Sequence, residues 1–121
     1  MRVLNLYHLP REQPVPPPGT VYIGRASPGR GLPQSPFANP FYLRPGSGDE
    51  VRAEVIERYR KWLWGEIRAG RISVQALLDL RGNDLLCYCA PKACHGDVVA
   101  KAVQWAGQRA GLEPTPLADP T

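Results

Sequence analysis

Cysteine is scarce in this sequence of 121 residues: there are three, and all of them lie between residues 87 and 94. An odd number of closely spaced cysteines does not form the disulfide framework of a small secreted domain, so we expect reduced thiols and a cytoplasmic protein. No apolar run approaches the roughly 18 residues that a membrane-spanning helix requires, so no membrane association is expected. The first ten residues lack the long apolar segment of a secretory signal.

Acidic residues are almost missing from the first 48 residues, which contain one acidic residue, Glu12, and five arginines. The remaining residues carry as many acidic as basic side chains, so the net charge of +4 comes from this first segment, which also holds ten of the fourteen prolines. A basic segment rich in proline and glycine suits an anionic partner, such as a phosphate group or a nucleic-acid backbone. A solvated basic surface explains the same charges, and the composition does not separate the two interpretations.

Length and composition predict one domain over residues 1–121, since 43% hydrophobic and 21% charged residues are ordinary values for a chain with one modest core. A stiff Pro-rich linker is expected over residues 13–19 and a loosely held tail over residues 112–121.

Apolar patterns predict strands over residues 2–9, 20–23 and 85–89. The last of these is a continuous apolar run, which is typical of a central, buried strand in a parallel sheet. Helices are expected from a Ser47–Glu50 capping box to Gly70, over residues 74–80 after a Ser73 cap, and over residues 93–109. Helical spacing places Tyr59 and Leu63 on the core face of the first helix. This order of elements predicts a small, layered α/β domain with a short, mainly parallel sheet flanked by helices.

Four side chains that bind transition metals lie within nine residues: Cys87, Cys89, Cys94 and His95. Cys87 and Cys89 share one face of the expected strand. In number and type the four side chains are sufficient for a tetrahedral zinc site. Their spacing is not that of a usual zinc knuckle, and adjacent helical residues diverge by about 100°, so Cys94 and His95 are poorly placed to share an ion. Small core residues explain Cys87 and Cys89 equally well.

The competing interpretation makes Cys94 a reactive thiolate and, with His95, the catalytic pair. In the first turn of the expected helix, Cys94 would face unpaired backbone N–H groups, which favour the thiolate. The same N–H groups would bind an anion, and Gly96 would let a ligand approach the backbone. Asp97 lies in this turn and offsets part of the positive potential. Direct contact between Cys94 and His95 does not follow from their spacing, because adjacent helical side chains do not face each other.

A second group of candidate residues follows the strand expected over residues 20–23. Arg25 stands just past the strand, where a guanidinium is well placed to bind a phosphate or carboxylate. Asn39 precedes Pro40 and is therefore restricted to an extended conformation, which would fix its amide for hydrogen bonding to a ligand. The alternative is a proline-rich turn in which Asn39 caps backbone groups.

Four segments of the chain resemble the uncharacterised bacterial and phage family catalogued as domain of unknown function 4326. They are VYIGR, SPFANPF, EVIERYRKWLW and GNDLLCYCAPKACHGDVVAKAV, and the resemblance covers about residues 18–106. The last segment is also similar, more distantly, to domain of unknown function 488. The resemblance implies that the family's motif blocks include Arg25, Asn39, Cys87, Cys89, Cys94, His95 and Asp97. The usual Gly-Asn-Pro-Phe motif of this family has Ala38 in place of its glycine here. The resemblance does not imply a particular reaction.

Two hypotheses remain from the sequence. In the first, the chain is an enzyme or a binding domain for a small anionic, nucleotide-like molecule: Arg25 and the helix start hold the anion, Asn39 orients the ligand, and Cys94 and His95 perform the chemistry. In the second, the chain is a small domain that binds nucleic acid through its basic segment. A structural zinc ion held by Cys87, Cys89, Cys94 and His95 stabilises the fold of this domain. Binding to nucleic acid should be weak and salt-dependent, because the charge excess of +4 allows few phosphate contacts.

Overall fold

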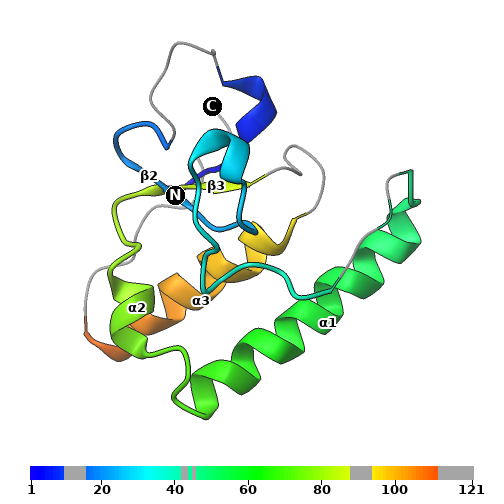
Figure 1. Ribbon diagram of the computed structural model, residues 1–121. Helices are drawn as coiled ribbons and strands as arrows, with labels where there is room; N and C mark the ends of the chain where they lie inside the picture. The colour runs from blue at the N-terminus through cyan, green and yellow to red at the C-terminus, as the bar shows by residue number, and fades with distance from the viewer. Residues whose placement is uncertain (10–15, 42–43, 45, 88–93, 112–121) are drawn as a thin grey trace.

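Three parallel strands form the centre of the protein in a computed structural model, which describes residues 1–9, 16–41, 44, 46–87 and 94–111 (Figure 1). The strands are β1 (Val3–Asn5), β2 (Thr20–Tyr22) and β3 (Asp84–Cys87), in the order β1-β3-β2. Leu85 pairs with Val3 on one side and with Val21 on the other. The apolar run that predicted a central parallel strand is therefore β3, and the small α/β class is confirmed.

Three α-helices cover one face of this sheet in two layers (Figure 1). They are α1 (Asp49–Arg68), α2 (Val74–Leu78) and α3 (His95–Arg109). Helix α3 contacts β3 directly, whereas α1 and α2 both pack against α3. The part of the chain that the structure describes also contains two short 3₁₀ helices, η1 (Leu6–His8) and η2 (Pro28–Arg30). Within the described residues, no helix combines the length and the apolar character needed to cross a membrane.

Both faces of β3 are buried, which explains why its residues are all apolar after Asp84. Leu85 and Cys87 belong to the main core, together with Tyr59 of α1 and Val99 of α3. Leu86 points to the opposite face and joins a smaller core whose other buried members are Leu6, Tyr22 and Leu32. Each large side chain that is fully buried in this way contributes roughly 1.5–3 kcal/mol to stability. Cys87 therefore lies on the face that α3 covers.

Several element boundaries differ from the predictions for local reasons. The expected strand over residues 2–9 stops at Asn5, because the Asn5 side chain accepts a hydrogen bond from the Tyr7 backbone and caps η1. The Ser47 capping box is wrong: the Ser47 hydroxyl donates to the Arg44 carbonyl at 2.7 Å, and Gly48 is the N-cap of α1. The Ser73 cap of α2 is confirmed, since its side chain accepts from the Ala76 backbone at 3.0 Å.

The last predicted helix starts later than expected, whereas residues 88 and 89 of the predicted strand lie outside the described residues. Strand β3 ends at Cys87 within the described residues, and α3 begins at His95, so Cys94 is the N-cap and does not lie in the first helical turn. The expected tail over residues 112–121 and the first three residues of the expected linker, 13–15, lie outside the described residues. The described end of that linker is a turn, in which the Thr20 backbone donates to the Pro17 carbonyl at 3.1 Å.

A close approach between α3 and the sheet depends on Gly96. A Cβ atom at this position would lie 2.9 Å from Val3 Cγ1 and 3.2 Å from Ile23 Cδ1, closer than ordinary packing allows. The glycine lets the start of α3 pack against Val3, the first residue of β1, and against Ile23, which follows β2. The space in front of its Cα is thus filled by protein side chains.

We expect Gly96→Ala to lower the free energy of unfolding by about 1–3 kcal/mol, because the added methyl group overpacks this contact. Gly65→Ala in α1 is the matched control, since a Cβ there would meet nothing within 4 Å. The control should gain up to about 1 kcal/mol from improved helix propensity. Urea denaturation measures both, and equal effects of the two substitutions would contradict the close contact.

Candidate thiol site at the carboxyl edge of the sheet

The carboxyl ends of the strands meet the start of α3, as the topology of a parallel sheet requires. Ile23 follows β2 directly, and its backbone N–H donates to the Leu86 carbonyl at 3.0 Å. Its own carbonyl oxygen lies 2.9 Å from Nε2 of His95, the first residue of α3. The segment that follows β2 therefore contacts the start of α3 at this edge of the sheet.

The N-cap position gives Cys94 a geometry that the sequence did not predict. Its backbone is extended, with φ −143° and ψ 154°, and its Sγ accepts a hydrogen bond from the Gly96 N–H at 3.4 Å. The Asp97 carboxylate reaches back and accepts from the Cys94 N–H at 3.2 Å. The thiol and this carboxylate together cap the helix. Because Cys94 is extended and not helical, its side chain can turn towards that of its neighbour.

His95 uses its two ring nitrogens for different partners. Nε2 faces the Ile23 carbonyl oxygen, which can only accept, so Nε2 must carry the hydrogen. In the neutral imidazole, Nδ1 is then the acceptor, and it lies 3.5 Å from Cys94 Sγ. The ring is 8% exposed, so its orientation is held by protein groups. A thiol beside a nitrogen base that a third group orients is the arrangement of an activated nucleophile.

Tyr59 holds the His95 ring from the side of α1. The two rings pack edge to face, with centroids 5.0 Å apart and an interplanar angle of 72°. The Tyr59 hydroxyl donates to the Phe37 carbonyl at 2.6 Å. Burial, with a smaller effect of charge at Cys94, raises the pKa of Tyr59 far above its usual range. Tyr59 therefore stays a hydroxyl donor and joins the loop after β2 to the thiol site.

Cys87 brings a second sulfur to the same place. Its Sγ lies 2.8 Å from Cys94 Sγ, and both side chains are buried thiols that are not joined by a disulfide. The structure thus places three of the four predicted zinc ligands together, while Cys89 lies outside the described residues. Among the residues described, no group of three or more Cys, His, Asp or Glu side chains is arranged to hold a metal ion.

Arg25 and Asn39, the predicted anion-binding residues, contact each other. Arg25 Nε donates to the Asn39 carbonyl oxygen at 2.9 Å, and the Arg25 side chain is exposed. The Asn39 side-chain oxygen accepts from the Phe41 N–H at 2.8 Å, which is the turn that the alternative interpretation predicted. The pair anchors the loop that follows β2.

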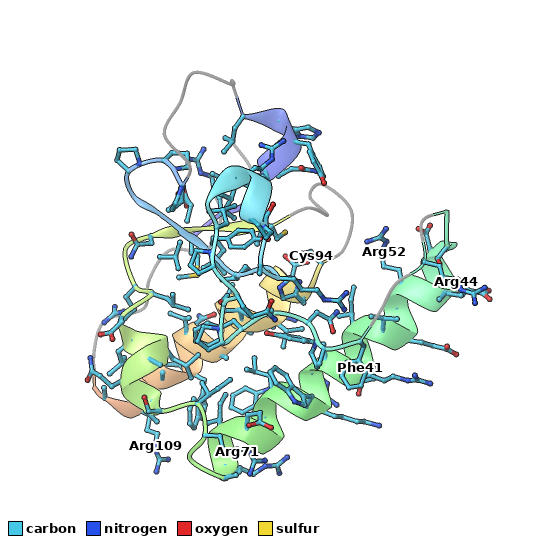
Figure 2. All side chains as sticks on the ribbon, viewed as in Figure 1. Phe41, Arg44, Arg52, Arg71, Cys94 and Arg109 are labelled. Atoms are coloured by element: carbon cyan, nitrogen blue, oxygen red, sulfur yellow. The ribbon has the colours of Figure 1, made fainter. Side chains whose placement is uncertain are left out.

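Arg52 is a charged residue of α1 that the sequence did not indicate as a candidate. It leaves the first turn of α1 on the side of Cys94, in contrast to Arg44 (Figure 2), and its Nε atom is buried. The signal was present in the helical spacing, because Arg52 precedes the core residues Val55 and Tyr59 by three and seven positions. An arginine at a position on the buried face of a helix indicates a guanidinium group close to the protein interior.

The fold and the site together define a small parallel α/β domain with a thiol and an imidazole paired at its strand ends. The model of the family described as Domain of unknown function (DUF4326) matches residues 8–105, and the chain belongs to this family. An uncharacterised 12.4 kDa protein in the nrdA-td intergenic region of Enterobacteria phage T4 is 42% identical over 52 residues. These residues are 43% of this chain and 48% of that relative, so the match spans about half of its length. No solved structure matches the chain.

We expect iodoacetamide to alkylate Cys94 before Cys87 at neutral pH, and His95→Gln to slow this alkylation by about tenfold. Glutamine keeps an N–H for the Ile23 carbonyl but lacks a basic ring nitrogen. Above the ordinary thiol pKa of about 8.5, where no base is needed, the two proteins should react at similar rates. Peptide mapping after a short pulse measures each cysteine. Equal rates at neutral pH, or faster alkylation of Cys87, would contradict the Cys94–His95 pair.

Proposed function

We propose that this domain binds a small phosphate-bearing, nucleotide-like molecule at the carboxyl edge of its sheet and attacks it with Cys94. The observation that carries the proposal is the orientation of His95, whose Nε2–H is held by the Ile23 carbonyl while Nδ1 faces Cys94 Sγ. Nothing in helix capping requires an imidazole in this orientation, since Cys94 and Asp97 already cap α3. A base for the thiol explains it.

The chemistry assigned to the pair is a proton transfer followed by nucleophilic attack. The Cys94 thiol gives its proton to Nδ1, and the resulting imidazolium keeps its Nε2–H on the Ile23 carbonyl. The Gly96 N–H that points at Sγ then stabilises the negative sulfur. Tyr59 keeps the ring in place during this exchange. The thiolate attacks an electrophilic carbon or phosphorus atom of the bound ligand; the bond from sulfur forms as the bond to the leaving group breaks, and the imidazolium gives its Nδ1 proton to that leaving group.

An anionic ligand is favoured by the charges around this edge. Arg25 is exposed at the end of β2, and Arg52 approaches from α1 (Figure 2). Asn39 positions Arg25 through its backbone carbonyl oxygen. Asp97 opposes this attraction in part, although its carboxylate is engaged with the Cys94 N–H. The predicted role of Gly96 in ligand binding is not retained, because Val3 and Ile23 side chains fill the space in front of its Cα and its N–H is directed at Cys94 Sγ.

Protection of Cys94 from alkylation tests ligand binding without knowledge of the reaction. We expect inorganic phosphate and adenosine monophosphate to slow labelling of Cys94 by iodoacetamide, the nucleotide more strongly. Arg25→Gln and Arg52→Gln should lose this protection, while Arg58→Gln keeps it. Arg58 is the matched control, because it is an exposed arginine on the same helix as Arg52. The proposal is wrong if neither anion protects, or if all three variants behave alike.

A zinc site is the second candidate function, favoured by the contacts of Cys94 Sγ with Cys87 Sγ and with Nδ1 of His95. A metal-bound imidazole commonly donates its other N–H to a backbone carbonyl, as His95 does to Ile23. In this case the basic first segment would bind nucleic acid, and the log–log salt slope should be only a few units.

Metal content separates the two candidates. Plasma mass spectrometry of protein purified without chelator would give stoichiometric zinc for the second candidate, and Cys94→Ser would lose it. A folded, metal-free protein would instead retain the nucleophile proposal and exclude the zinc module.

A further inference from the structure

The proposed attack uses one sulfur, but the site contains two. Cys87 is the last residue of β3 and is fully buried, whereas Cys94 is 2% exposed at the start of α3. Their Sγ atoms lie 2.8 Å apart, although the residues come from different elements. The packing of a small apolar side chain explains why Cys87 is buried, but any small residue would serve that purpose. Packing alone does not explain why the Cys87 side chain directs a sulfur atom at Cys94 Sγ.

The surroundings of the two sulfurs are different. Cys94 Sγ has the His95 ring nitrogen at 3.5 Å and the Gly96 N–H at 3.4 Å, and both stabilise its thiolate. Cys87 belongs to the apolar main core, where burial disfavours a charged sulfur. An external reactant therefore meets Cys94 as the reactive thiol. Cys87 lies behind it, within reach of any group that forms on Cys94 Sγ.

We propose that Cys94 and Cys87 form a redox pair that a hydroperoxide oxidises, with Cys94 as the attacking thiol and Cys87 as the resolving thiol. The Cys94 thiolate attacks one oxygen of the peroxide; the O–O bond breaks, hydroxide leaves, and Cys94 becomes a sulfenic acid. The Cys87 sulfur then attacks Cys94 Sγ, and the S–O bond breaks with loss of water. In total, two thiols and one hydrogen peroxide give one disulfide and two waters.

The geometry favours the second step. Two sulfur atoms in contact need only a small movement to reach the disulfide bond length of about 2.05 Å. The disulfide would remove the thiolate on which the proposed function depends, and a dithiol reductant would restore it. The inference rests on the proposed function only for the reactivity of Cys94, and its own content is the role of Cys87.

Hydrogen peroxide is the probe, because it is the simplest hydroperoxide and its products with a thiol are known. The reduced, metal-free, full-length protein is treated with peroxide in the presence of dimedone, which traps sulfenic acids. We expect the wild-type protein to lose two hydrogens, to yield a peptide linking Cys87 and Cys94, and to recover with dithiothreitol. In Cys87→Ser the sulfenic acid cannot be resolved, so dimedone should label Cys94 at least several-fold more than in the wild type.

Cys89→Ser is the matched control, because it removes a neighbouring thiol and should behave like the wild type. The inference is overturned if Cys87→Ser and the wild type trap equal amounts of dimedone, or if the disulfide links Cys89 to Cys94. The proposed nucleophile stands in those cases if iodoacetamide still alkylates Cys94. If Cys94 reacts with neither peroxide nor iodoacetamide in a folded protein, the proposed function fails as well. Circular dichroism of each variant establishes that it is folded.

Discussion

One hydrogen bond, from His95 Nε2–H to the Ile23 carbonyl, determines the geometry of the whole candidate site. It joins the start of α3 to the end of β2, and it decides which ring nitrogen carries the hydrogen. Because Nε2 is the donor, Nδ1 is directed at Cys94 as an acceptor. Tyr59 packs against the same ring, and its hydroxyl donates to the Phe37 carbonyl in the loop that follows β2. Without this bond the thiol would have a helix cap but no base.

The proposals for this site differ in what would occupy it. With an anionic ligand, Cys94 would act as the nucleophile and the arginines would attract the ligand. With zinc, the thiols and Nδ1 would be the ligands, and the Ile23 carbonyl would orient the imidazole. With an oxidant, Cys87 would form a disulfide with Cys94. All three depend on the close approach that Gly96 allows between α3 and the sheet, which brings the N-cap to the end of β3.

The sequence predicted those features that depend on local patterns or on topology. The apolar run of β3 gave its central position, helical spacing gave the core face of α1, and Ser73 was confirmed as a cap. The Cys94–His95 contact was missed because it depends on an extended N-cap, which Asp97 and the packing of α3 stabilise together. Tyr59 was assigned to the core, and its second role as a support for His95 requires the position of a helix distant in sequence. The Ser47 cap failed because a nearby carbonyl competes for that hydroxyl.

The protonation state of His95 is the most direct measurement of this arrangement. Nitrogen-15 NMR of the metal-free, reduced protein at neutral pH distinguishes a protonated ring nitrogen from an unprotonated one. We expect the His95 signals to show hydrogen on Nε2 and none on Nδ1, and Cys94→Ala to shift Nδ1 while leaving Nε2 almost unchanged. Hydrogen on Nδ1 in the neutral ring would reverse the assignment, because the imidazole would then donate to Cys94 and could not accept its proton.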